Sequence, residues 1–187
     1  MWNLPNTLTL LRIALIPVFI AVYYMPWAGS HILSAAIFGV AALTDWVDGY
    51  LARKLEQVTP FGAFLDPVAD KLIVVAALVM LLEIHSSIWF ALPAMIIIGR
   101  ELVISALREW MAERNYRETV AVSMLGKVKT WVQMVSVALL LLAMPDYPIY
   151  YQLGMLGICV AAFLALWSML LYLRQAWPQL QGSADSD

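Results

Sequence analysis

Six long apolar segments fill almost the whole sequence, and their length constrains the fold more than any other feature. They cover residues 8–25, 32–52, 61–82, 88–107, 120–143 and 149–173. A helix needs about 20 apolar residues to cross the hydrocarbon core of a bilayer, and each segment approximately meets that requirement. With 63% hydrophobic and 13% charged residues, the chain is far more apolar than a soluble domain. The sequence therefore predicts an all-α integral membrane bundle of six transmembrane helices.

The breaks between the segments are short, so we expect a single domain over 1–177 and a polar C-terminal tail over 178–187. The first segment lacks the basic start and small-residue cleavage site of a signal peptide, and we interpret it as a retained span. A net charge of −2 without a long basic tract argues against nucleic acid as a partner. The single cysteine, Cys159, excludes a disulfide within the chain.

The distribution of lysine and arginine predicts the orientation. If the N-terminus is cytoplasmic, the three outer breaks contain no lysine or arginine. Cytoplasmic loops are enriched in these residues, so an even number of spans places both termini in the cytoplasm. The basic residues of the inner breaks and ends are Arg53, Lys54, Arg108, Arg114, Arg117, Lys127, Lys129 and Arg174.

Four aspartates lie at the predicted cytoplasmic flanks of the second and third segments. Helical periodicity places Gly49 and Ala52 on the same helix face as the two aspartates of the second segment. It places Gly62 on the same face as the two aspartates of the third segment. A short connector makes the two segments antiparallel neighbours, so their acidic faces can converge. Four carboxylates in one cleft need cations to offset their repulsion, and oxygen ligands suit Mg²⁺ or Mn²⁺. The aspartates are Asp45, Asp48, Asp66 and Asp70.

Two such ions would bridge the oxygens of a diphosphate, and neighbouring residues fit a nucleotide site. Gly49 and Gly62 leave room for a ligand against the backbone, and Arg53 offers a planar fork to a phosphate. A structural alternative makes Asp66 a helix N-cap followed by Pro67 at the first helical position. Four acids on two facing stripes favour function instead, because acids within membranes are usually functional.

A basic cluster supplies a candidate site for a second, anionic substrate. Arg100 and Arg108 are eight residues apart and share one face of the fourth segment, while Lys127 and Lys129 open the fifth segment at the same end. Such a cluster suits a phosphate group. The ordinary alternative is that these residues serve topology and anionic headgroups. Arg100 precedes Glu101 inside an apolar segment and needs a partner or ligand there.

The acidic residues and their neighbours spell D-x2-D-G-x2-A-R-x8-G-x3-D-x3-D, from Asp45 to Asp70. This pattern resembles the signature of the CDP-alcohol phosphotransferase family at every fixed position. Further stretches resemble one bacterial branch of that family in the right order, and the resemblance covers nearly the whole chain. They are "PNTLTLLR", "TDWVDGYLAR", "FGAFLDPVADK", "GRELVISALREW" and "GKVKT".

The resemblance implies an enzyme of the bacterial inner membrane, usually a homodimer, with its active site facing the cytoplasm. It would transfer the phosphatidyl group of CDP-diacylglycerol to sn-glycerol 3-phosphate and release CMP. Sister enzymes use other alcohols, and residue spacing alone does not separate them. A small cation or proton transporter is the alternative from another class, although ion conduction needs no nucleotide pocket.

The resemblance also implies roles for individual residues. Asp45, Asp48 and Asp66 would bind the metal ions, and Asp70 would share in metal binding and act as general base on the glycerol hydroxyl. The residues implied for the CDP site are Asn6, Thr9, Arg12, Gly49, Ala52, Arg53 and Gly62.

Overall fold

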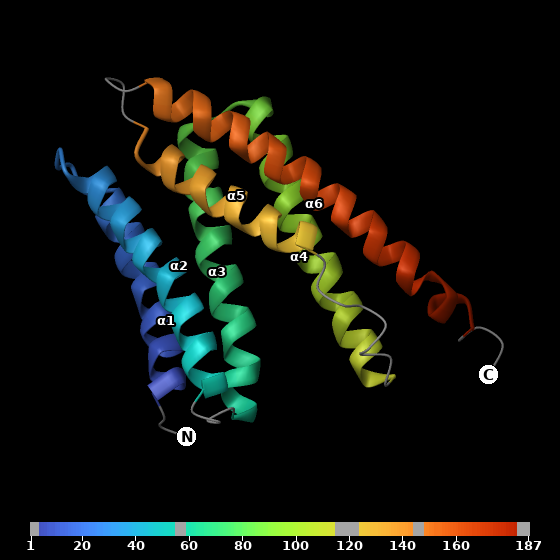
Figure 1. Cartoon of the computed structure of the whole chain (residues 1–187). Helices are drawn as coiled ribbons and strands as arrows, with labels where there is room; N and C mark the ends of the chain where they lie inside the picture. The colour runs from blue at the N-terminus through green and yellow to red at the C-terminus, as the bar shows by residue number, and fades with distance from the viewer. Residues whose placement is uncertain (1–3, 55–58, 115–123, 144–147, 183–187) are drawn as a thin grey trace.

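The computed structural model describes residues 4–54, 59–114, 124–143 and 148–182, with the side chains of 45–54 and of Lys127 among those left undescribed. The described residues form six α-helices and no strand (Figure 1). The predicted all-α fold is confirmed, and each predicted segment corresponds to one helix. The helices are α1 (Leu4–Tyr23), α2 (Ser30–Lys54), α3 (Pro60–Ile84), α4 (Ile88–Glu113), α5 (Met124–Leu141) and α6 (Pro148–Gly182).

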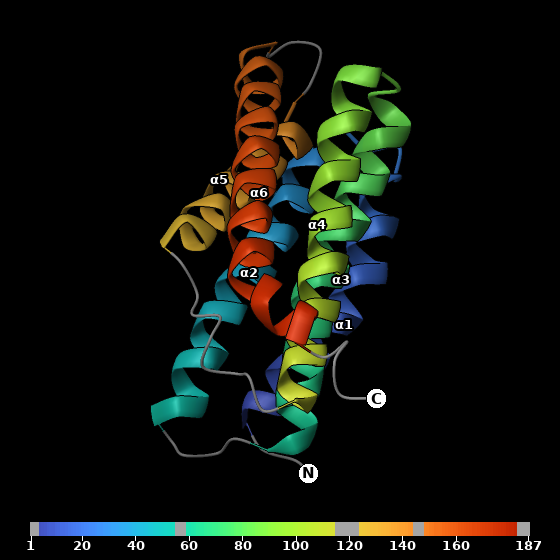
Figure 2. The same cartoon turned by 90° about the vertical axis from the view of Figure 1, so that its right-hand side faces the viewer.

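The helices form two groups that meet along the middle of the bundle. Helix α1 packs against α2 and α3, while α6 packs against α4 and α5. Figures 1 and 2 show these two groups side by side. Helix α3 contacts both α4 and α5, and α2 also reaches α5. Helix α3 therefore lies at the boundary between the two groups, where it can contribute to a site shared by them.

The helices are apolar in the manner of a membrane protein. Three stretches in the described part of the chain are long and apolar enough to cross a bilayer: Asn6–Tyr23, Ile88–Glu113 and Pro148–Gln179. Shorter apolar stretches lie in α2 and α5. Large apolar side chains such as Phe64, Leu102 and Phe163 are exposed on the outer surface, which is unfavourable in water. The chain is a membrane helical bundle.

Helix α3 begins with a well-formed N-cap. The Thr59 hydroxyl accepts a hydrogen bond from the Gly62 backbone N–H at 3.0 Å, and Pro60 occupies the start of the helix, where its missing N–H costs nothing. Asp66 and Pro67 consequently lie inside α3. The alternative that made Asp66 an N-cap is wrong, and its carboxylate is available for another task.

Helix α6 is longer than the predicted segment. It continues to Gly182, so the first residues of the expected polar tail are helical, while residues 183–187 lie outside the description. Its contact with α5 is close at Gly154, where an added Cβ would lie 2.7 Å from Leu140 Cγ and 3.2 Å from the Leu140 backbone nitrogen. Small residues permit such close approach between membrane helices.

We expect Gly154→Ala to destabilise the bundle by about 1–3 kcal/mol, the usual cost of overpacking. The added methyl group meets Leu140 of α5, including its backbone. Thermal unfolding of the purified protein in detergent measures the effect. Gly39→Ala is the matched control, because no atom lies within 4 Å of its added Cβ and alanine favours a helix. Equal melting temperatures for the two variants would contradict this account of the α5–α6 contact.

Candidate functional site

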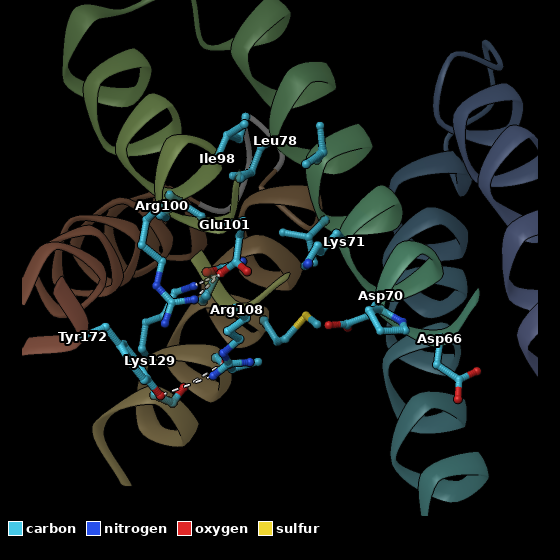
Figure 3. Close-up of a pocket in the computed structure, with 18 residues that line it drawn as sticks. Asp66, Asp70, Lys71, Leu78, Ile98, Arg100, Glu101, Arg108, Lys129 and Tyr172 are labelled. Atoms are coloured by element: carbon cyan, nitrogen blue, oxygen red, sulfur yellow. Dashed lines mark hydrogen bonds and ion pairs between the residues drawn. The ribbon is translucent and has the colours of Figure 1, made fainter. Parts of the chain in front are cut away.

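A cavity of about 370 Å³ lies between α3, α4, α5 and α6 and brings predicted site residues together. Asp66 and Asp70 line it from α3, one helical turn apart. Arg100, Arg108 and Lys129 line it from α4 and α5. Figure 3 shows Asp66, Asp70 and Lys71 on the α3 side of the cavity, and the three cations of α4 and α5 on the other side. The prediction that Arg100 and Arg108 share one face of their helix is confirmed.

Asp66 is oriented by helix α1. The Thr9 hydroxyl donates a hydrogen bond to Asp66 Oδ1 at 2.5 Å, and Thr9 is fully buried. A short hydrogen bond to a carboxylate is stronger than one between neutral groups. Thr9 therefore holds one oxygen of Asp66 in place. Its predicted part in nucleotide binding stays a prediction.

The start of α1 also reaches the start of α3. The Asn6 side-chain amide donates to Thr59 Oγ1 at 3.0 Å, and a hydrogen bond of 3.1 Å joins Thr59 Oγ1 to Asn6 Oδ1. A Cβ added at Gly62 would lie 2.4 Å from Asn6 Oδ1. The space beside Gly62 is thus taken by Asn6, which gives this glycine a structural reason independent of any nucleotide. Arg12 is buried on the same helix.

The remaining residues of the acidic motif lie on the last turns of α2. Helical structure there agrees with the periodicity used to group them. Their side chains are outside the described residues, so the predicted convergence of the two acidic faces stays a prediction. These residues are Asp45, Asp48, Gly49, Ala52 and Arg53.

A divalent metal site is compatible with the side chains on α3. Asp66 and Asp70 offer carboxylate oxygens one turn apart, the donor type that Mg²⁺ and Mn²⁺ prefer. Among the described residues no group of three or more acidic, histidine or cysteine side chains forms a potential metal site. Asp45 and Asp48, the other two predicted ligands, are not among the side chains covered by that statement.

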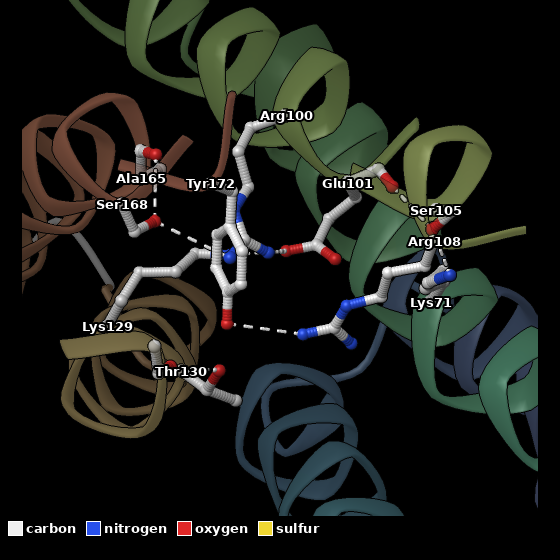
Figure 4. A network of polar contacts seen from close by, with 11 residues as sticks. Lys71, Arg100, Glu101, Ser105, Arg108, Lys129, Thr130, Ala165, Ser168 and Tyr172 are labelled. Carbon is white, nitrogen blue, oxygen red and sulfur yellow. Dashed lines mark hydrogen bonds and ion pairs between the residues drawn. The ribbon is translucent and has the colours of Figure 1, made fainter. Parts of the chain in front are cut away.

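The basic wall of the cavity is built around Glu101. Arg100 Nη1 donates to Glu101 Oε1 at 2.9 Å, and Lys129 Nζ forms an ion pair with the same oxygen. Arg100 Nη2 donates to the Ser168 hydroxyl of α6 at 3.4 Å. Figure 4 shows the side chains of Arg100 and Lys129 converging on Glu101. Three helices, α4, α5 and α6, therefore fix these two positive charges. The side chain of Lys127 lies outside the description.

Arg108 is held by a second residue of α6. Its Nη2 donates to the Tyr172 hydroxyl at 3.3 Å, and its guanidinium lies 5.5 Å from the centre of the Tyr172 ring (Figure 4). Tyr172 is buried, so the tyrosine provides a fixed support. Ser168 and Tyr172 are four residues apart and lie on one face of α6, facing the two arginines of α4.

Sequence analysis missed Ser168 and Tyr172, and it treated Glu101 only as a neighbour of Arg100. One signal was present, because Ser168 is a polar residue inside an apolar segment. A further polar contact joins the two walls of the cavity, where Lys71 Nζ of α3 donates to Ser105 Oγ of α4. Lys71 is thus joined to α4.

This arrangement suits two anionic groups at once. The α3 side offers carboxylates that can hold metal ions against a diphosphate, and the α4–α5 side offers fixed cations for a phosphate. Such a bundle is a membrane protein with a cavity lined by charged side chains of both signs. The chain belongs to the CDP-alcohol phosphatidyltransferase family, whose family model matches residues 2–173.

Curated relatives resemble the chain over nearly its whole length. A protein of Pseudomonas fluorescens is 51% identical over 96% of this chain and 92% of its own. Proteins of Escherichia coli (strain K12) and Salmonella typhimurium are each 54% identical over 94% of this chain and 95% of their own. All three carry the name CDP-diacylglycerol–glycerol-3-phosphate 3-phosphatidyltransferase.

Proposed function

We propose that the chain is a phosphatidylglycerophosphate synthase. It transfers the phosphatidyl group of CDP-diacylglycerol to sn-glycerol 3-phosphate and releases CMP. Relatives that carry the name of this activity are 51–54% identical to the chain and cover more than nine tenths of it. Residues 2–173 match the family model, which supports the same class of reaction.

One structural observation carries the proposal: the cavity has carboxylates on one wall and fixed cations on the other. Asp70 lines the α3 side, while Arg100, Arg108 and Lys129 line the α4–α5 side. A carboxylate can accept a proton from an alcohol, and clustered cations can hold a phosphate. An acceptor that combines a hydroxyl with a phosphate matches both walls.

Asp45, Asp48, Asp66 and Asp70 would hold Mg²⁺ or Mn²⁺, with two ions as the expected number. Bound there, the ions would reduce the charge of the diphosphate and stabilise CMP as it leaves. Thr9 supports this role by holding one oxygen of Asp66 in place. Membership of the family supports the use of a divalent metal ion.

Asp70 is the proposed general base. Its carboxylate accepts the proton of the free primary hydroxyl of glycerol 3-phosphate, whose oxygen then bonds to the phosphorus attached to diacylglycerol. The bond from that phosphorus to the oxygen of CMP breaks, and CMP keeps the electron pair. Asp70 lies on the cavity wall, within the space that an acceptor held by the cations opposite would occupy.

Arg100, Arg108, Lys127 and Lys129 are the proposed ligands of the acceptor phosphate. Ser168 and Tyr172 hold the two arginine side chains in place, which reduces the entropy lost when the phosphate binds. This basic wall favours a phosphorylated acceptor over serine or another alcohol without a phosphate. The proposed CDP site comprises Asn6, Thr9, Arg12, Gly49, Ala52, Arg53 and Gly62.

We further propose that both termini and the mouth of the cavity face the cytoplasm of a bacterial cell, with the bundle in its inner membrane. Lysine and arginine occur at one end of the spans in sequence, which supports this orientation. A homodimer is expected from the family resemblance alone. The transporter alternative gains no support from the similarity to transferases over most of the chain.

A panel of acceptors tests the proposed function. Detergent-purified protein is mixed with CDP-diacylglycerol and Mg²⁺, then with glycerol 3-phosphate, glycerol, serine or inositol, and CMP release is measured. We expect release with glycerol 3-phosphate, a labelled lipid product, and loss of both after chelation of the metal. Release of CMP with another alcohol alone would identify that alcohol as the acceptor in place of glycerol 3-phosphate. No release with any alcohol would overturn the proposal that the protein is an enzyme.

Asp70→Asn should leave CDP-diacylglycerol bound but abolish turnover, because an amide cannot accept the hydroxyl proton. The losses typical of removing a general base are about 10²–10⁴-fold. Turnover is measured with labelled glycerol 3-phosphate, and lipid binding is measured separately with labelled CDP-diacylglycerol. Full activity of this variant would count decisively against Asp70 as the base.

Arg108→Gln should raise the KM for glycerol 3-phosphate about tenfold, which corresponds to about 1.4 kcal/mol. The variant removes a charged donor from the cavity wall and leaves the CDP-diacylglycerol site intact. Arg114→Gln is the matched control at the C-cap of the same helix, because Arg114 lies 4.8 Å from the centre of the Trp110 ring and does not line the cavity. Equal KM values for the two variants would show that Arg108 does not bind the acceptor.

A further inference from the structure

Glu101 is an unexpected residue in a cavity proposed to receive an anion. It lies on the same wall as three cations, and a carboxylate there repels a phosphate. A direct role as a phosphate ligand is therefore excluded by charge. Its position needs another explanation, which the contacts of its oxygens supply.

The two cations that touch Glu101 are removed from water. The side chains of Lys129 and Arg100 are 1% and 9% exposed. A buried charge without a partner is very costly, and it is removed by loss of the proton or by movement of the side chain. Glu101 compensates both cations through a single oxygen, Oε1. It stabilises both positive charges on the cavity wall before any ligand arrives.

The contacts leave donors available for a ligand. An ammonium group has three N–H donors and a guanidinium has five. In the described part of the chain, Lys129 Nζ contacts Glu101, and Arg100 uses Nη1 for Glu101 and Nη2 for Ser168. Most N–H groups of these cations are thus unused by the pairing. A phosphate can add to the cluster without displacing Glu101.

Glu101 also changes the net charge of the wall. Arg100, Arg108 and Lys129 carry three positive charges, and Glu101 removes one, which leaves two. A phosphate monoester carries close to two negative charges at neutral pH. A phosphodiester or a carboxylate carries one, and an unphosphorylated alcohol carries none. Glu101 thus lowers the net positive charge that these three cations present, and the wall stays cationic enough to attract a phosphate monoester.

We propose that Glu101 is a positioning and specificity-determining residue, which acts through Lys129 and Arg100 to prepare the site for a phosphate monoester dianion. This inference rests on the proposed function, and it adds a residue that never touches the acceptor. Glu101 fixes where the cations point and sets the net charge they present.

Kinetics of Glu101→Gln test the inference in the full-length protein in detergent. The amide keeps the size of the side chain and removes its charge. We expect the KM for glycerol 3-phosphate and the inhibition constant of inorganic phosphate to rise together, each at least tenfold. The KM for CDP-diacylglycerol and the melting temperature should stay within the range of Glu109→Gln, a control at an exposed glutamate on the same helix. Unchanged values for both phosphate ligands would overturn the proposal.

A double-mutant cycle separates positioning from general damage. Lys129→Met should raise the KM for glycerol 3-phosphate strongly, because it also leaves Glu101 to repel the ligand. Adding Glu101→Gln to that variant should cause a smaller loss than it causes in the wild-type protein, since the part of its effect that passes through Lys129 is already absent. Additive losses would refute the proposed route. If Glu101→Gln fails to fold, Glu101→Asp is measured in its place. This variant keeps the charge on a shorter side chain, so its KM for glycerol 3-phosphate should exceed that of the wild-type protein.

The outcome is distinguishable from failure of the proposed function. Wild-type protein that does not transfer to glycerol 3-phosphate would refute the proposed function itself. Wild-type protein that transfers normally, together with a Glu101→Gln variant of unchanged KM, would refute only the role of Glu101.

Discussion

Compensation of buried charge is the constraint on which this structure depends. The chain places arginine and lysine side chains among apolar helices, where an uncompensated charge is very costly. Glu101 pairs with Arg100 and Lys129, and Ser168 and Tyr172 complete the contacts of the two arginines on α4. Because the partners come from α4, α5 and α6, satisfying these charges also fixes how the three helices pack. The basic wall is thus part of the fold as well as part of the site.

The opposite wall, formed by α3, is held in place by hydrogen bonds from neutral groups. Thr59 caps α3 and is joined to Asn6, and Thr9 holds Asp66. Neutral hydroxyl and amide groups of α1 therefore set the position of α3 and of one of its carboxylates. The acids of this wall, Asp66 and Asp70, line the cavity opposite the cations of α4 and α5. A site for a metal-bound diphosphate requires such carboxylates.

Much of the fold was predictable, because six apolar segments with short breaks permit few alternatives to a six-helix bundle. The face shared by Arg100 and Arg108 also followed from helical periodicity, since their spacing of eight is local. The contacts of Glu101, Ser168 and Tyr172 were not predictable in this way. They join helices that are distant in sequence, and periodicity carries no information on which helix faces which. Gly62 shows the same limit, because its contact with Asn6 depends on how α1 docks against α3.

The cavity is shared between α3 and the group formed by α4, α5 and α6, and this has a consequence for the stability of the protein. A molecule that touches both walls acts as a reversible cross-link between the two halves of the bundle. Ligands that bind only the native state stabilise it in proportion to the logarithm of their concentration. Loss of such a ligand would therefore weaken the contact between α3 and the other half of the bundle.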